Sequence, residues 1–229
     1  MGGSSYPPGM RNALASRGSI VQPVGTRAAL RPLAGFQIRR VETREEWREV
    51  RALRHRALAS RGDLLEGADG YPDDGFDNAL NSATFLLTQH ASPVGCIRTS
   101  VSSASRRWPL PSIDPFRAEI EASIGWDATI VEASLGAIEP AFPGDSREVL
   151  FQLLRAPMQR CDLEDADWLI VAVAESQIGF HRRMFNMEIL SGSEHCPRLA
   201  LPRVLMGLDY RRHAALLYRR IPALAATLS

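Results

Sequence analysis

A carboxylate interrupts an otherwise apolar segment of this sequence. Glu132 lies within residues 129–138 (TIVEASLGAI), a short apolar and β-branched run bounded by turn residues, which predicts a strand. A carboxylate buried in such a strand should have a raised pKa and could accept a proton near neutral pH. Glu132 is therefore a candidate general base, although a purely structural ion pair would also explain it.

An arginine interrupts a second apolar strand, predicted over residues 94–101. A buried arginine is uncommon without a carboxylate partner, so Arg98 should have one nearby. Asp74, Asp77 and Glu132 are the candidates. Arg98 could then bind the carboxylate of a substrate, or it could brace the acidic loop that carries the two aspartates.

Two oppositely charged segments come before these strands. A helix predicted over residues 42–60 begins at a Thr43–Glu46 capping box and carries an arginine-rich face. Residues 63–77 form a glycine-rich acidic loop without calcium-loop spacing. The arginine face could be solvated, or it could bind a phosphate or carboxylate, and the acidic loop could be exposed or could bind a substrate amine. The arginines of the helix face are Arg44, Arg48, Arg51, Arg54 and Arg56.

Composition limits the class of protein. The 229 residues suffice for one well-buried domain, and 45% hydrophobic and 23% charged residues are typical of a globular protein. The net charge of +1, with every basic residue an arginine, gives no general attraction to nucleic acid. The three cysteines form no CxxC pair, which favours the cytoplasm and predicts no metal site. No apolar run is long enough to predict a membrane span.

The predicted elements alternate along the chain. A strand at 36–41 and the helix at 42–60 precede a hairpin, with strands at 84–87 and 94–101 joined by a turn at 89–93. An irregular or short helical connection covers 112–125. After the strand at 129–138, a helix at 146–161, a strand at 168–174, a helix at 175–185 and a strand at 187–190 follow. A loop at 191–203, a strand at 204–208 and a helical segment from 210 complete the order.

This order of elements predicts an α/β (α+β) fold, a mixed twisted sheet with helices on both faces. Residues 1–33 are expected to be a mobile tail, 34–210 the domain, and 211–229 a C-terminal helical tail.

Five short motifs resemble, in order, those of the acyl-homoserine-lactone synthases and N-acyl amino acid synthases of the GNAT acyltransferase superfamily. The motifs are the arginine-bearing helix with Arg51 and Arg54, Asp74-Gly-Phe-Asp77, Val94-Gly-Cys-Ile-Arg98, Val131-Glu-Ala-Ser134 and Phe180-His-Arg-Arg-Met-Phe185. They span residues 36–208. Pro109-Leu110-Pro111 and residues 201–208 resemble the N-acyl amino acid branch more closely.

The resemblance implies a GNAT-like acyltransferase fold and transfer of a fatty acyl group from a thioester to an amino acid amine. The catalytic positions it implies are Glu132, Ser134 and His181, with an oxyanion held by backbone N–H groups near 133–135. The implied substrate-binding positions are Arg98, Asp74, Asp77, Arg54, Phe76 and Trp108. The implied docking positions for a carrier protein are Arg51, Arg54, Arg182 and Arg183. Leu135 stands where the family has an arginine, and Phe180 and His181 stand where the superfamily has a tyrosine.

The turn at 139–146 bears on the acyl donor. Acetyl-CoA-dependent members bind the pyrophosphate with backbone N–H groups of a glycine-rich loop at this place. Pro140 and Pro143 remove donors here, and Asp145 puts a negative charge at the next helix N-terminus. The resemblance and this turn together favour acyl-phosphopantetheine on acyl carrier protein as donor, with no separate cofactor.

Two other functions remain open on the sequence. A homoserine-lactone synthase of the same fold would use S-adenosylmethionine and release methylthioadenosine. A non-catalytic acyl-binding or carrier-protein-binding module would explain Leu135 and the missing tyrosine.

Overall fold

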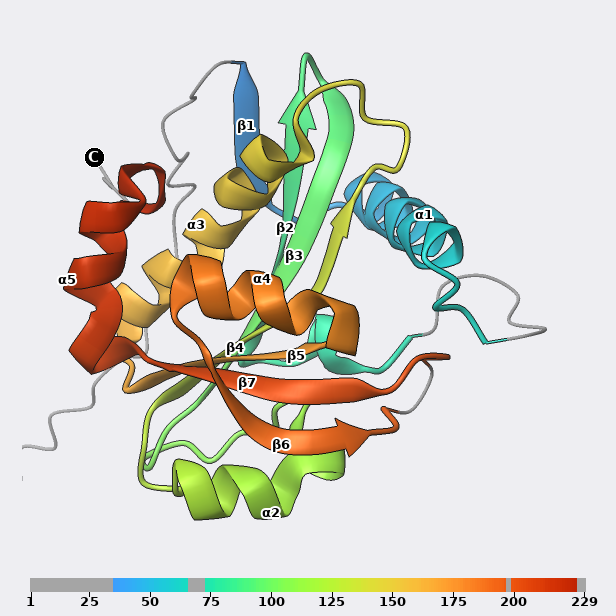
Figure 1. The fold of residues 1–229 in the computed structure, drawn as a ribbon. Helices are drawn as coiled ribbons and strands as arrows, with labels where there is room; N and C mark the ends of the chain where they lie inside the picture. The colour runs from blue at the N-terminus through green and yellow to red at the C-terminus, as the bar shows by residue number, and fades with distance from the viewer. Residues whose placement is uncertain (1–34, 66–72, 197–198, 226–229) are drawn as a thin grey trace, which may run out of the picture.

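The computed structural model describes residues 35–65, 73–196 and 199–225. Its centre is one mixed sheet of seven strands in the order β1-β2-β3-β4-β5-β7-β6 (Figure 1). Only β4 and β5 pair in parallel, and the other neighbours are antiparallel. The strands are β1 Phe36–Arg40, β2 Ser82–Gln89, β3 Ser92–Ser102, β4 Ile130–Ile138, β5 Trp168–Val173, β6 Glu188–Glu194 and β7 Arg203–Asp209.

Helices cover both faces of this sheet, as the order of elements predicts. The helices α1 and α2 lie on one face, and α3, α4 and α5 lie on the other (Figure 1). The α-helices are α1 Arg44–Ser60, α2 Ile113–Ser123, α3 Ser146–Glu164, α4 Glu175–Phe185 and α5 Tyr210–Arg220. Two short 3₁₀ turns, η1 Phe76–Asn78 and η2 Pro222–Leu224, complete the described elements. The mixed α/β architecture is thus confirmed.

Side chains of β4 alternate between the two faces, and this alternation builds two separate cores. Val131 and Ala133 pack in the larger cluster with residues of α3. Ile130 packs in a different cluster with Phe116 and Ile120 of α2. Glu132 must therefore point to the α1 and α2 face, because it shares the orientation of Ile130.

The hairpin and the last strands differ from the sequence prediction. Strands β2 and β3 extend further than predicted, and they are joined by His90 and Ala91 alone. Both residues have positive φ (49° and 65°), as a two-residue hairpin turn requires.

The predicted loop at 191–203 is also shorter than predicted, because β6 continues to Glu194 as an irregular edge strand. A polar edge strand lacks the apolar alternation that would have revealed it.

The chain ends are placed only in part. The predicted mobile tail at 1–33 lies outside the described residues. The helix α5 begins with Asp209 as its N-cap, and its buried Leu217, together with Leu224 of η2, packs into the main core. Within the described part of the chain, we find no helix that is both long and apolar enough to span a membrane.

Candidate active site

A network of buried charges lies on the α1 face of β3. The Arg98 guanidinium binds both oxygens of Asp74, with distances of 2.7 Å from Nη1 and 2.6 Å from Nη2. Its Nη1 also lies 3.4 Å from Asp77 Oδ1, and its Nε donates to Ser134 Oγ at 3.1 Å. Arg98 is fully buried. The carboxylate partner that burial of Arg98 predicts is therefore present, and it is mainly Asp74.

A second arginine joins this network from α1. Arg54 is 1% exposed, and its Nη1 lies 2.7 Å from Asp77 Oδ2. Thr84 Oγ1 donates to the other Asp77 oxygen at 3.1 Å. Asp77 thus bridges two arginines, which compensates for removing their charges from water. Arg54 offers no surface to a carrier protein, so its predicted docking role is wrong.

These contacts set the ionisation of Asp74, which lies with Asp77 in the turn at residues 73–78, here called the acidic turn. Burial alone opposes ionisation of Asp74, but the hydrogen bonds and charge of Arg98 hold its pKa below the ordinary value. The Phe76 ring, in the same turn, lies 5.6 Å from the Arg98 guanidinium carbon. With both aspartates engaged, Arg98 braces the acidic turn, which was one of its two predicted roles. The side chain of Asp74 is 27% exposed and gives this network its contact with solvent.

Glu132 lies on the neighbouring strand β4, two residues before Ser134, which is paired with Arg98. It is 1% exposed, and burial raises its pKa to about 7 against the lowering effect of its hydrogen bonds. Ser112, just before α2, supplies those bonds: its Oγ lies 2.7 Å from Oε1 and its N lies 3.0 Å from Oε2. Arg98 acts on Glu132 through its field rather than through direct contact. A carboxyl group with this pKa is suited to accept a proton at neutral pH.

The strands β4 and β5 separate next to Glu132. Their pairing ends at Ala133 and Val171. Beyond that point β4 bulges away from regular pairing with β3, and Leu135 adopts a positive φ of 51°. Gly136 is exposed although β4 lies in the middle of the sheet. Beyond Ala133, the backbone of β4 is therefore not paired with β5.

An apolar cavity lies on the opposite face from Glu132, next to the separating strands. Its volume is about 20 Å³, enough for one water-sized group. Ala133 of β4, Leu154 of α3, Phe185 of α4, Leu217 of α5 and Leu224 of η2 contribute to its lining.

His181 also lines this cavity. Burial lowers the pKa of His181, which favours the neutral ring. Its Nδ1 lies 3.1 Å from the Gln177 carbonyl oxygen, which can only accept, so Nδ1 carries the proton. The other nitrogen then has no proton to give, and this arrangement does not favour the predicted role of His181 as a general acid.

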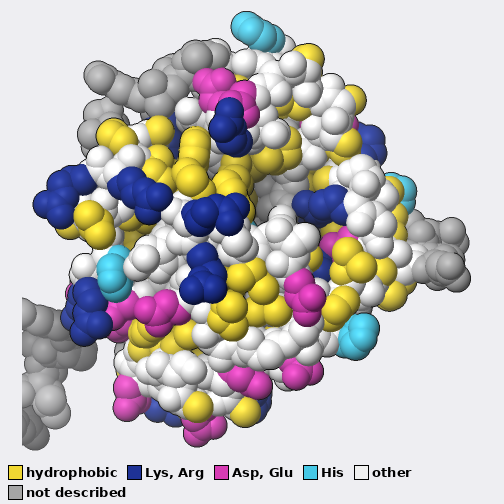
Figure 2. Space-filling view, viewed as in Figure 1, with side chains coloured by type: hydrophobic (Ala, Val, Ile, Leu, Met, Phe, Trp, Pro, Cys, Tyr) yellow, Lys and Arg dark blue, Asp and Glu magenta, His cyan; other side chains and the backbone are white. Residues whose placement is uncertain are grey.

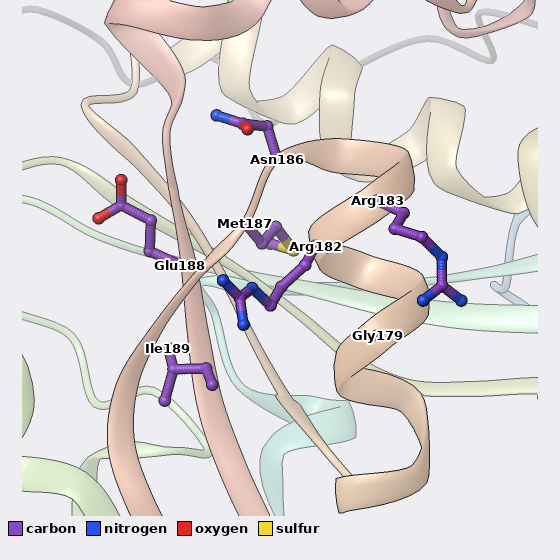
Figure 3. A pocket seen from close by; sticks show the side chains of 7 residues that line it. All are labelled: Gly179, Arg182, Arg183, Asn186, Met187, Glu188 and Ile189. Carbon is purple, nitrogen blue, oxygen red and sulfur yellow. The ribbon is translucent and has the colours of Figure 1, made fainter.

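A larger open pocket lies where α4 meets β6, with a volume of about 720 Å³. Arg182 and Arg183 leave α4 in different directions at its rim (Figure 3). Arg183 folds back over Gly179, where an added Cβ would meet its Nη1 at 3.0 Å. Arg182 and Arg183, the predicted docking arginines on α4, are exposed, and so is Arg51 on α1. Trp108, a predicted substrate-binding residue, is 37% exposed and lines neither of the two described pockets.

The sequence matches the family described as N-acyl amino acid synthase FeeM over residues 49–209. The chain belongs to this family. It is accordingly an N-acyltransferase, and the resemblance and the activity predicted from the sequence motifs are confirmed at the level of the family. A comparison with curated protein sequences finds no match.

Solved structures show the same fold. FeeM from uncultured soil microbes is 14% identical, with a TM-score of 0.66 over 79% of this chain and 93% of FeeM. The acyl-homoserine-lactone synthase LasI is 17% identical, with a TM-score of 0.53 over 79% and 93%. ElaA of Escherichia coli is 14% identical, with a TM-score of 0.51 over 75% and 97%. The GNAT-like fold is thus confirmed, and at these identities the structures show the fold alone.

Sequence reasoning missed one member of this site. Ser112 lies 20 residues before Glu132, next to the helix α2 that the sequence indicates only weakly. A serine at a helix start is expected to cap that helix, so no local signal connects it with a distant carboxylate.

Proposed function

We propose that this member of the FeeM family transfers a fatty acyl group from the phosphopantetheine thioester of acyl carrier protein to the amine of an amino acid. The observation that carries the proposal is Glu132, a buried carboxyl with a pKa of about 7 beside the point where β4 and β5 separate. The three cysteines are unpaired, which supports a reducing location such as the cytoplasm.

In this reaction the amine nitrogen attacks the thioester carbonyl carbon and the C–S bond breaks. Glu132 takes a proton from the acceptor ammonium group through a bridging water, because its own carboxylate is buried. Backbone N–H groups of residues 133–135 stabilise the tetrahedral oxyanion. The thiolate of phosphopantetheine leaves, and the second proton lost by the amine nitrogen passes through solvent to that thiolate. Glu132 then releases the first proton to solvent. The network of Arg98 and Asp74 holds the acidic turn against the acceptor, with the Phe76 ring beside the Arg98 guanidinium.

The acyl chain then lies on the opposite face from the acceptor. The thioester enters between the separating strands, and the chain continues into the apolar cavity lined by Ala133 and Leu217. The cavity must widen to hold a fatty chain, which requires side chains of α4 and α5 to move. The lining offers almost no polar partner, which supports an apolar acyl group on the donor.

The carrier protein docks on the exposed arginines of α4 and α5. Figure 2 shows arginine side chains gathered on the face that carries α4 and α5. The exposed arginines of these two helices are Arg182, Arg183, Arg211, Arg212, Arg219 and Arg220. A phosphopantetheine arm entering from this side would bring its acidic carrier onto these side chains.

The test is turnover of acyl-loaded carrier protein with a mixture of amino acids, followed by mass spectrometry of the products. The Glu132→Gln variant should lose at least about a hundredfold in rate, as expected for removal of a general base. Glu121→Gln, an exposed glutamate on α2, serves as the matched control and should keep the wild-type rate. A Glu132→Gln variant with full activity would show that another group takes the proton.

A further inference from the structure

Ser112 occupies the position immediately before α2, yet its hydroxyl makes no hydrogen bond to that helix. Serine at this position normally accepts a hydrogen bond from a backbone N–H of the first helical turn. Here the hydroxyl and the backbone N–H of Ser112 are both directed to Glu132. The helix α2 therefore lacks the usual side-chain cap, and the Glu132 carboxylate of β4 accepts both hydrogen bonds from Ser112.

The two donors are not equivalent. A backbone N–H can only donate, so Oε2 of Glu132 remains an acceptor in either protonation state. A hydroxyl can donate or accept, so it donates to Oε1 of the carboxylate and can turn to accept from the carboxylic acid. When the proton arrives on Oε1, the N–H bond to Oε2 is kept and the hydroxyl can turn to accept, so both hydrogen bonds stay satisfied.

We propose that Ser112 is the positioning residue of this base: its N–H fixes Oε2, and its hydroxyl adapts to the protonation of Oε1, the oxygen that receives the amine proton. The proposal rests on the proposed role of Glu132 as general base. Ser112 is 2% exposed and so is held in place by the packing around it.

Few other groups in the described residues can set the ionisation of Glu132. Arg98 on β3 favours the charged form, and Asp74, before η1, opposes it. Cys196, after β6, is influenced by Glu132, but its own pKa is raised to about 11, so it stays neutral. The neighbouring side chains of α2 and β5, Ile113 and Ile170, are apolar. Ser112 is therefore the adjustable hydrogen-bonding partner.

The test compares pH profiles of kcat and kcat/KM for wild type, Ser112→Ala and Ser112→Thr, with one carrier-bound acyl donor and one amino acid. Loss of the hydroxyl should raise the pKa of Glu132 and move the acid limb upward by about one pH unit. The rate at pH 6 should then fall about tenfold while the high-pH plateau changes little. Ser112→Thr keeps the hydroxyl and should keep the wild-type profile. Titration of the acceptor amine is common to all variants and cancels in the comparison.

A second readout does not depend on turnover. The carboxyl resonance of Glu132, assigned by its loss in Glu132→Gln, should titrate about one pH unit higher in Ser112→Ala than in wild type by ¹³C NMR. Ser191→Ala is the matched control, because Ser191 is a buried serine whose Oγ contacts only backbone groups. It should shift neither the resonance nor the acid limb.

The outcomes separate the two proposals. An active Glu132→Gln variant would overturn the base itself, and the positioning role with it. An inactive Glu132→Gln together with an unshifted Ser112→Ala would overturn only the role of Ser112, as would an equal shift in Ser191→Ala. Should Ser112→Ala fail to fold, Ser112→Cys replaces it: its weaker S–H donor should give an intermediate shift, and a wild-type profile would refute the proposal.

Discussion

At the scale of single residues, burial decides what each ionisable group can do. Arg98 and Asp77 are both buried and held by partners, so they serve as a rigid base for the acidic turn. Glu132 differs because both of its donors are neutral and belong to one residue, Ser112. Burial, with no cation bound directly to the carboxylate, raises the pKa of Glu132 to about 7, which suits a general base.

The raised pKa of Glu132 makes the free energy of unfolding depend on pH. The folded carboxyl has a pKa of about 7 against an ordinary 4.5, so between these values the folded chain keeps a proton that the unfolded chain releases. This contribution to stability is present at pH 4.5 and is lost as the pH rises to 7, by about 3 kcal/mol in all. Glu132→Gln should remove this slope, so its stability relative to wild type should increase over the same window.

Urea unfolding at pH 5, 6, 7 and 8 measures this difference directly. Glu121→Gln, which removes an exposed carboxyl, should run parallel to wild type throughout. Parallel profiles for Glu132→Gln and wild type would mean that the carboxyl titrates normally in the folded chain.

At the scale of elements, the strand β4 combines regular pairing with a local distortion. Residues 130–133 pair on both sides, whereas Leu135 adopts a positive φ of 51° next to the exposed Gly136. This conformation is unfavourable for a residue with a Cβ and is retained where the surrounding structure requires it. The distortion falls in the part of β4 where the pairing with β5 has ended.

The variant Leu135→Gly tests whether the bulge is strained. Glycine adopts positive φ freely, so this substitution should stabilise the fold by up to about 1 kcal/mol relative to Leu135→Ala, which keeps the Cβ. Thermal unfolding of the two variants gives the comparison. A glycine variant less stable than the alanine variant would show that the conformation of Leu135 carries no appreciable strain.

The sequence predicts regular elements better than this kind of distortion. The apolar runs that became β4 and β5 and the capping box that begins α1 are local patterns, and they place those elements to within a few residues. A carboxylate partner for Arg98 was also predictable, because a buried arginine demands one, but the sequence left Asp74 as one of three candidates. The bulge at Leu135 and the contact of Ser112 with Glu132 depend on neighbouring strands and helices, and no local pattern encodes them.

At the scale of the whole molecule, the sheet separates two kinds of environment. The α1 and α2 face holds the charged network and Glu132, whereas the α3, α4 and α5 face holds the apolar cavity and the exposed arginines of α4 and α5. The two environments meet where β4 and β5 separate. A transfer from an apolar thioester to a charged amino acid would use both sides of this opening.

The exposed arginines of α4 and α5 should bind the carrier protein by charge. The double reversal of Arg182 and Arg183 to Glu should weaken carrier binding at least about tenfold at low salt, and the loss should shrink as ionic strength rises. Fluorescence anisotropy of labelled acyl carrier protein at several salt concentrations measures this. Arg117→Glu, an exposed arginine on α2, is the matched control. Equal weakening by both changes would place the docking surface elsewhere or make it non-specific.

The helix α5 should limit the length of the acyl chain. Its Leu217 lines the apolar cavity, while Tyr210 and Tyr218 bind Asp162 of α3 at 2.6 Å and 2.8 Å and hold the helix in place. Leu217→Ala should destabilise the fold by about 2–5 kcal/mol but leave a larger cavity. Because each buried methylene contributes about 0.8 kcal/mol, the variant should prefer chains a few carbons longer than wild type does. Competition between acyl-loaded carriers of different chain length, read by mass spectrometry, measures the preference. Leu163→Ala, an exposed leucine of α3, should leave it unchanged, and an unaltered preference in Leu217→Ala would place the chain outside this cavity.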